Sequence, residues 1–241
     1  NSGVFCLKKD RFQDVVWIGT DGQGVYLYST LLYSIKSMVL SNYTEKIERP
    51  VRAIYLDDER TFWVGTKGNG ILKIYDYEFD KNISDCRAGV LTTSNSALSS
   101  NAVYCFAKSH RNLLWIGDEE GLTYYSYREK RIKSIPIRIG NEDFKYIHDI
   151  YETADSELWL ASVGMGVVKA RIAGTPDNPV IVDAQRYVIN DGELGSNYFF
   201  TIYAENEANL LFGNKGYGVF RYNETTNGLE PEIGRASCRE R

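Results

Sequence analysis

The residue types that most often perform chemistry are sparse in this sequence. Its two histidines are predicted to lie on opposite faces of a repeated strand structure, with His110 in a loop after a first strand and His148 at the entry of one. They therefore cannot share one metal ion. Neither lies near a serine in a turn suited to display a nucleophile, so Ser/His/Asp catalysis is not favoured. The sequence predicts no metal site and no cofactor.

Clustered carboxylates are the other candidates for chemistry, because two nearby carboxyl groups can divide general acid and base roles between them. They occur in three places, Asp57-Asp58, Asp118-Glu119-Glu120 and Glu142-Asp143. Each cluster falls in a predicted loop. We expect solvated turn residues there, and no catalytic residue in this chain.

One short pattern recurs five times and must position all of these groups. Its copies are Val16–Val25, Phe62–Ile71, Leu114–Leu122, Leu158–Val167 and Leu211–Val219. All four tryptophans share one slot, at Trp17, Trp63, Trp115 and Trp159, and Leu211 fills it in the last copy. Glycines share a second slot, at Gly19, Gly65, Gly117 and Gly213. Successive tryptophan-slot positions are 46, 52, 44 and 52 residues apart, a period typical of β-propeller blades.

The glycine-rich end of each copy could be mistaken for a phosphate-binding loop. A phosphate loop needs a helix behind it, whose N-terminal dipole attracts the anion. Here a strand is predicted after every copy. We interpret these segments as turns in which glycine adopts a positive φ.

The predicted fold is all-β, a propeller segment of about five four-stranded antiparallel blades. The blades fall at approximately 1–45, 46–95, 96–142, 143–193 and 194–231. No fourth strand is recognisable in the fifth blade, so we expect that blade to be incomplete and the chain to be an arc cut from a larger propeller. Before each slot, apolar residues stand three apart, as in Val51 and Ile54, which predicts first strands buried on opposite faces. The polar stretch 78–95 is interpreted as a surface insertion.

The last ten residues, 232–241, resemble the translation of a sequencing-adapter oligonucleotide. We expect them to be read-through and not natural sequence, with the natural chain interrupted near Pro231. A natural basic tail is the alternative.

Composition narrows the class of protein. An apolar content of 43% supports a packed core, and a net charge of -4 does not favour binding to nucleic acid or to a membrane surface. No apolar run approaches the roughly 18 residues of a membrane span. No leader is recognisable, so any secretion signal is expected upstream. Cys6 and Cys105 stand at matching strand positions, which predicts small buried residues and not reactive thiols.

Ligand contacts are predicted on the face that carries the glycine-rich turns. In a four-stranded meander this face also carries the link into the next blade, such as Ser99-Ser100-Asn101 and Gly195-Ser196-Asn197. The candidates are the turn residues that the scaffold does not need, namely Asp21, Gln23, Lys67, Asn69, Glu119, Glu120, Asn214, Lys215 and Tyr217. The 18 tyrosines could instead stack on sugar rings, but packing between blades is the favoured interpretation.

The pattern Trp-Ile-Gly-Thr-x-Gly-x-Gly-Val/Ile resembles the two-component regulator propeller repeat, and Asn95–Asn101 resembles its blade-entry signature. Leu114–Tyr127 and Asn197–Tyr222 are especially similar to the extracytoplasmic sensors of Bacteroidetes hybrid two-component systems. The resemblance covers roughly residues 4–230. Asp118, Ala161-Ser162 and Leu211 depart from the repeat.

This resemblance implies that the chain is part of a much larger, homodimeric parent protein. Such parents join periplasmic propellers through a small β-sandwich and one membrane helix to a histidine kinase, a receiver and often a DNA-binding domain. The chain would then be the periplasmic part of an inner-membrane protein and would sense glycan-derived oligosaccharides without being an enzyme itself. Its partners would be that glycan ligand and the remaining blades and domains of the parent, with no nucleic acid bound by this segment.

Two other functions stay open on the sequence. One is a free-standing secreted propeller acting as a lyase or hydrolase, or as a carbohydrate-binding protein, since unrelated functions share this fold. The other is an adhesion or scaffolding propeller. The sequence does not identify the ligand, the total number of blades or the oligomeric state.

Overall fold

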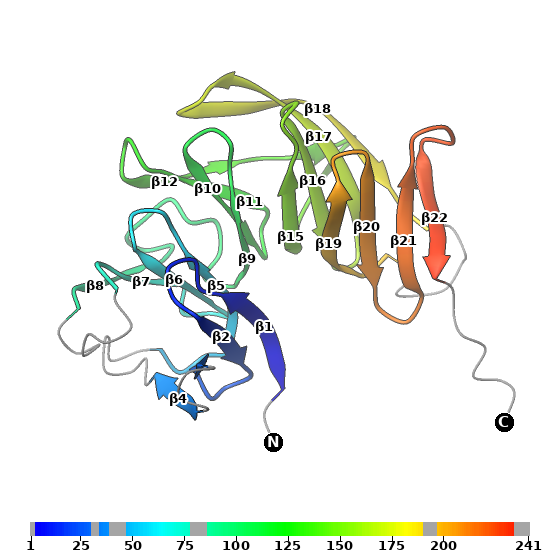
Figure 1. The fold of residues 1–241 in the computed structure, drawn as a ribbon. Helices are drawn as coiled ribbons and strands as arrows, with labels where there is room; N and C mark the ends of the chain where they lie inside the picture. Colours follow the sequence, from blue (N-terminus) through cyan, green and yellow to red (C-terminus); the bar gives the residue numbers. More distant parts are fainter. Residues whose placement is uncertain (1–2, 30–33, 39–46, 78–85, 190–196, 234–241) are drawn as a thin grey trace, which may run out of the picture. The chain divides into compact units, whose positions relative to one another are not determined.

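The structure, a computed structural model, describes residues 3–29, 34–38, 47–77, 86–189 and 197–233. These residues form strands and turns, with no helix among them, and they build five four-stranded antiparallel sheets plus one small hairpin (Figure 1). In each four-stranded sheet, neighbours in the chain are neighbours in the sheet. The predicted all-β propeller of five blades is confirmed. No helix in these ranges is long and apolar enough to cross a membrane.

The five sheets are the five blades, and their strands follow one another along the chain. Blade 1 comprises β1 (Val4–Lys9), β2 (Val15–Thr20), β3 (Val25–Ser29) and β4 (Ser34–Met38). Blade 2 comprises β5 (Val51–Leu56), β6 (Phe62–Thr66), β7 (Ile71–Ile74) and β8 (Ala88–Leu91). Blade 3 comprises β9 (Val103–Lys108), β10 (Leu113–Asp118), β11 (Leu122–Ser126) and β12 (Arg131–Ile135).

The hairpin of β13 (Arg138–Ile139) and β14 (Glu142–Asp143) follows blade 3. Blade 4 comprises β15 (Ile147–Glu152), β16 (Glu157–Ser162), β17 (Gly166–Thr175) and β18 (Asn178–Tyr187). Blade 5 comprises β19 (Phe199–Asn206), β20 (Asn209–Asn214), β21 (Gly218–Asn223) and β22 (Gly228–Ile233). The chain divides into two compact units, 1–106 and 107–241, with the division inside β9.

Each unit buries its core between successive blades. In the first unit, Trp17 of blade 1 belongs to one cluster with Val51, Ile54 and Val64 of blade 2. In the second unit, Trp159 of blade 4 packs with residues of blade 5 such as Phe199, Phe212 and Phe220. The tryptophan slot is buried in blades 1 to 4, as expected for an aromatic ring that fills the space between two sheets.

The fifth blade is complete, so the predicted incomplete blade was wrong. Its fourth strand, β22, runs to Ile233 and therefore passes the predicted boundary at 231. Pro231 disguised it, because proline is rare inside sheets. β22 is an edge strand, where a missing N–H costs nothing on the open side, and Pro231 pairs with Phe220 next to a register shift. The rest of the predicted adapter segment, 234–241, lies outside the described residues.

Smaller differences concern the fourth strands. The predicted insertion at 78–95 contains β8, while 78–85 lies outside the described residues. In blade 3 the fourth strand ends at Ile135, and the Glu142-Asp143 pair forms one arm of the added hairpin.

A β-bulge in the first strand of four blades corrects the predicted strand geometry. In β5, Val51 pairs with Thr66 but Ala53 pairs with Gly65, so Arg52 is an extra residue. Val51 and Ile54 therefore lie on the same face, and not on opposite faces. β1, β15 and β19 show the same shift. In β1 the two matching residues, Val4 and Leu7, are 57% and 64% exposed, so the prediction that they are buried was also wrong.

The glycine slot lets neighbouring blades approach each other. A Cβ on Gly65 would lie 2.9 Å from Val103 Cγ1 in the next blade and 3.2 Å from both Ala53 and Phe106. We expect Gly65→Ala to destabilise the first unit by about 1–3 kcal/mol, because the extra methyl overpacks this contact. Urea unfolding followed by tryptophan fluorescence measures it. Gly22→Ala is no matched control, because its φ of 79° is itself unfavourable for alanine. Gly3→Ala, where nothing lies within 4 Å, should leave the midpoint unchanged.

Candidate functional site

The glycine-rich turns are held by the entry segment of the following blade. The N–H groups of Gly68 and Gly70 both donate to the carbonyl of Asn101, at 2.9 Å each. In the second unit, Gly164 and Gly166 donate in the same way to Asn197, at 3.1 Å. The prediction that turns and entry segments share one face is therefore confirmed for these two pairs. Positive φ values at the turn glycines confirm the predicted turn type.

The two entry asparagines are structural residues that sequence reasoning did not single out. Asn101 Oδ1 accepts a hydrogen bond from the Thr93 N–H at 2.9 Å, and Asn197 Oδ1 accepts one from the Ile189 N–H at 2.7 Å. Each side chain thus ties the end of one blade to the start of the next, while its backbone holds the turn. Their matching place before each first strand was the available signal.

The four predicted ligand residues of the first unit differ in whether their side chains are exposed or hydrogen-bonded to the backbone. Asp21, Gln23 and Lys67 are exposed. The amide of Asn69 instead accepts hydrogen bonds from the backbone N–H groups of Glu48 and Arg49, at 3.3 and 3.0 Å. Asn69 is therefore used by the scaffold, whereas the other three side chains remain candidates.

In the second unit five predicted ligand residues lie on blades 3 and 5. Glu120 is ion-paired with Lys145, and the Glu119 carbonyl accepts the Tyr146 N–H at 3.0 Å. On blade 5, Lys215 is exposed, while Asn214 and Tyr217 are half-buried, and Tyr217 packs against the core. The backbone N–H of Lys215 donates to the Tyr198 carbonyl at 2.9 Å, in the entry segment of blade 5. Ligand binding by the nine residues stays a prediction.

Two of the predicted solvated carboxylates, Asp57 and Asp118, are buried and structural. Asp57 is 1% exposed; its Oδ2 accepts the indole N–H of Trp63 at 2.8 Å and its Oδ1 accepts the Thr61 N–H at 2.7 Å. Asp10 holds Trp17 in the same way, at 2.9 Å. The interpretation of Asp57 as a solvated residue was therefore wrong, whereas Asp58 beside it is exposed and pairs with Arg11 at 2.7 Å.

Removing the Asp57 carboxylate should be costly. We expect Asp57→Ala to lower the free energy of unfolding by about 2–3 kcal/mol, because the indole N–H of Trp63 and the Thr61 N–H would be left buried without an acceptor. Asp58→Ala is the matched control and should cost no more than about 1 kcal/mol, as an exposed ion pair does. Equal losses in the two variants, measured by urea unfolding, would contradict the structural role of Asp57.

Asp118 compensates for the short turn of blade 3. In blade 2 the hydroxyl of Thr66 donates to the Gly70 carbonyl across the turn. Asp118 replaces that threonine; its Oδ1 accepts the N–H groups of Glu120 and Gly121 at 2.9 and 3.0 Å. A carboxylate can accept two donors at once, so the departure from the repeat stabilises a turn that has lost one glycine. Asp118 is fully buried, so its interpretation as a solvated residue was wrong.

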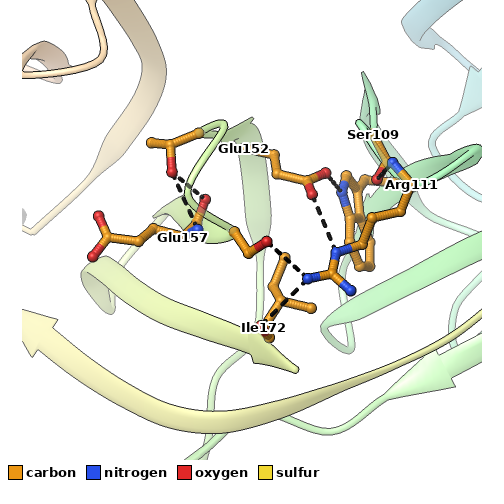
Figure 2. Close-up of polar contacts among 8 residues, drawn as sticks. Ser109, Arg111, Glu152, Glu157 and Ile172 are labelled. Atoms are coloured by element: carbon orange, nitrogen blue, oxygen red, sulfur yellow. Dashed lines mark hydrogen bonds and ion pairs between the residues drawn. The ribbon is translucent and has the colours of Figure 1, made fainter. Parts of the chain in front are cut away.

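A buried ion pair joins blades 3 and 4 inside the second unit (Figure 2). Glu152, at the end of β15, accepts the indole N–H of Trp115 through Oε2 at 2.6 Å. Its Oε1 lies 3.7 Å from Nε of Arg111, which comes from the loop after β9. The side chains are 1% and 16% exposed. Glu152 therefore performs for Trp115 the task that Asp57 performs for Trp63, but from the neighbouring blade.

Arg111 reaches three parts of blade 4. Besides Glu152, its Nη2 donates to the Ser156 hydroxyl at 2.8 Å and to the Ile172 carbonyl at 3.4 Å. Its own backbone N–H donates to Ser109 Oγ at 3.0 Å, which fixes the start of the loop (Figure 2). Ser109 occupies the place of Asp57 in its loop and is too short to reach an indole as well. Sequence reasoning missed this network because its members lie on different blades.

The bulges of the first strands carry planar side chains in both units. The extra residues are Phe5, Arg52, His148 and Phe200, and Tyr104 stands at the same position of blade 3 by sequence. The Arg52 guanidinium lies over the Phe5 ring at 3.6 Å, and the His148 and Phe200 rings meet edge-on at 5.1 Å. Phe5 and Phe200 are 41% and 42% exposed. A bulge can re-aim a side chain away from the core, so these positions are candidate contacts that the sequence analysis did not identify.

The two histidines lie at opposite ends of first strands, as predicted, and two of the tyrosines pack inside the protein. His110 follows β9 and is exposed, whereas His148 lies at the start of β15. The part of the chain that the structure describes holds no group of three or more metal-ligating side chains. Tyr124 and Tyr125 are buried, with Tyr124 edge-on to Trp115 at 5.8 Å, which confirms packing for that pair.

Cys6 is partly buried, and burial raises the pKa of its thiol to about 11. At about pH 8 only about one thiol in a thousand would be deprotonated, and the thiolate is the reactive form. We expect alkylation of Cys6 by iodoacetamide to be slow in the folded protein. It should accelerate in urea, where the pKa returns to its ordinary value. Mass spectrometry of the Cys6 peptide over time measures both rates, and equal rates would contradict the prediction.

Comparisons with known proteins identify the fold. No family profile and no curated protein matches the sequence. The extracellular domain of BT3049 from B. thetaiotaomicron, described as a hybrid two component system, matches 94% of this chain and 28% of its own length, with a TM-score of 0.68 and 21% identity. The extracellular domain of BT4673 from the same organism, described as a one component system, matches 96% of this chain and 43% of its own, with a TM-score of 0.63 and 14% identity.

A third match comes from a different kind of system. PorZ, an essential bacterial surface component of the type-IX secretion system of Porphyromonas gingivalis, matches 90% of this chain and 31% of its own, with a TM-score of 0.65 and 14% identity. The chain thus spans less than half the length of each of these proteins. At such identities the likeness concerns the fold alone: this chain is a β-propeller that shares its fold with the extracellular domains of BT3049 and BT4673.

Proposed function

We propose that this chain is the extracytoplasmic, ligand-sensing propeller segment of a hybrid two-component sensor histidine kinase. The observation that carries the proposal is the match of 94% of the chain to the extracellular domain of BT3049. The repeat pattern leads independently to the same kind of system. The kinase activity, the membrane helix and the homodimeric assembly belong to the proposed parent, whose periplasmic part this chain would be.

The proposed ligand is an oligosaccharide, and the chain binds it without turnover. Three of the carboxylates that could have acted as acids or bases are occupied by indole or backbone N–H groups, namely Asp57, Asp118 and Glu152. A group held by structural hydrogen bonds is a poor proton shuttle, because a proton transfer would break those bonds. Binding would bias the parent between two signalling states through differences in ligand affinity.

A glycan array probed with the 241-residue chain, followed by product analysis on every glycan that binds, tests this proposal. Binding without cleavage supports it. Cleavage of a bound glycan would overturn the non-catalytic part and favour the alternative of a secreted lyase or hydrolase.

The match to PorZ supports a second candidate, a surface propeller that acts outside two-component signalling. The coding sequence of the source DNA distinguishes the two. A frame that continues into a membrane helix and a histidine kinase supports the sensor, and one that ends in a secreted protein supports the second candidate.

A further inference from the structure

Phe5 and Arg52, at the bulges of β1 and β5, form a stacked pair that could select one class of sugar. We propose that it binds the carboxylate or sulfate group of an acidic oligosaccharide. The proposal rests on the proposed function, because it specifies the class of glycan and the residues that select it.

Arg52 owes its position to the bulge of β5. The bulge adds one residue to β5, and its flanking residues Val51 and Ala53 are both buried in the blade. Arg52 is therefore turned out of the packed faces, on the strand next to β1. β1 has its bulge at the matching place, so that Phe5 lies directly against the guanidinium. Two backbone irregularities in register thus create one side-chain pair.

Arg52 carries a positive charge that no carboxylate of the described residues neutralises. An arginine keeps its charge at any physiological pH. Within the part of the chain that the structure describes, no carboxylate forms an ion pair with Arg52, and its buried Nε has no hydrogen-bond partner. Arg11, in the loop after β1, contrasts with it, because Asp58 in the loop after β5 pairs with it at 2.7 Å. Arg52 is thus a cation that the scaffold positions without neutralising.

The placement of the Arg52 guanidinium over the Phe5 ring suits it to bind an anion. A guanidinium that lies flat on an aromatic ring keeps its N–H groups in the plane, pointing past the edge of the ring. Two of them in a fork match the paired oxygens of a carboxylate or sulfate. The exposed part of the Phe5 ring offers an apolar surface on which the C–H face of the same sugar can pack. Lys8, whose Nζ lies 5.9 Å from the Tyr55 ring, adds a second positive charge along these strands.

The test compares three classes of glycan on one array: neutral, carboxylated and sulfated. Wild-type chain should bind acidic glycans in preference to neutral ones, and added salt should weaken that binding. Arg52→Gln should reduce the affinity for the best acidic glycan by about tenfold to a hundredfold, the value of a hydrogen-bonded charge. Arg52→Lys should retain part of the affinity, because it keeps the charge but loses the fork.

Controls separate binding from folding. Arg138→Gln removes an equal charge from an exposed ion pair of the hairpin and should change nothing. Phe5→Leu, at an exposed ring outside the core, should weaken acidic binding several-fold without changing the unfolding midpoint, and it replaces Arg52→Gln if that variant does not fold. The preference between carboxylated and sulfated glycans shows which anion is recognised.

The outcomes are distinguishable. If wild-type chain binds no glycan, the proposed function fails and this inference fails with it. If it binds only neutral glycans, or binds acidic ones equally well after Arg52→Gln, the inference is overturned while the proposed function stands.

Discussion

Glu152→Ala is expected to destabilise the second unit by about 3–5 kcal/mol, one of the largest effects in the chain. The substitution removes the only carboxylate within ion-pairing distance of Arg111 among the described residues and the hydrogen-bond acceptor of the Trp115 indole. A charge left buried without its partner costs far more than the intact pair contributes. Urea unfolding followed by tryptophan fluorescence would show the loss as a lower midpoint.

Two further variants separate the charge from the hydrogen bond. Glu152→Gln retains an oxygen that can accept the Trp115 N–H, but it leaves Arg111 unpaired. Combining it with Arg111→Met removes the unpaired charge as well, so the double variant should recover most of the stability that Glu152→Gln loses. If the losses of unfolding free energy measured for Glu152→Gln alone and Arg111→Met alone simply add in the double variant, the ion pair is not the source of the effect.

This network also illustrates where sequence reasoning stops. The tryptophan slot predicts that an indole is buried in blades 1 to 4, but not which residue accepts its N–H. In blades 1 and 2 the acceptor is an aspartate six or seven residues upstream, Asp10 or Asp57. In blade 3 it is Glu152, 37 residues downstream on the next blade. Only the packing of one sheet on another can specify such a partner.

The fold itself could be predicted to a large extent because its signals are local. A buried strand, a glycine turn and a further strand are written within ten residues, and five copies in register fix the number of blades. Predictions from sequence failed where a β-bulge or an edge strand departs from the usual rules for strands. Val51 and Ile54 read as an ordinary strand, because a bulge leaves the same apolar spacing whichever faces the residues occupy. Pro231 argued against a strand that is tolerated only because it is the last of its sheet.

The candidate site was less predictable, for a physical reason. Turn residues such as Asn69 look dispensable in sequence, yet the amide of Asn69 holds the chain that enters β5, the first strand of its own blade. Conversely, Arg52 lies inside an apolar strand pattern, where a charged residue without an ion-pair partner among the described residues would not be sought. Whether a polar side chain serves the scaffold or a ligand depends on neighbours that are distant in sequence, so exposure and pairing had to come from the structure.

Trp63→Ala is the second substitution with a large expected effect, a loss of about 3–5 kcal/mol of unfolding free energy. Trp63 is fully buried, and its ring lies 4.2 Å below the Lys73 ammonium and 6.2 Å from Phe106. Its removal leaves a large cavity and deprives the buried Asp57 of its indole donor. Chemical denaturation measures the loss, with Trp17, Trp115 and Trp159 as the remaining fluorophores.

Blade 5 provides the control for this prediction, because it already carries leucine in the same slot. Leu211 is half-buried and pairs with Tyr203, which is 63% exposed, so this face of the blade is not covered and needs no indole. Leu211→Ala should therefore cost clearly less than Trp63→Ala. Trp63→Phe fills most of the space but leaves Asp57 without the indole N–H, and we expect a loss of about 1–3 kcal/mol. If Trp63→Ala were no more harmful than Leu211→Ala, the slot would not owe its tryptophan to burial between blades.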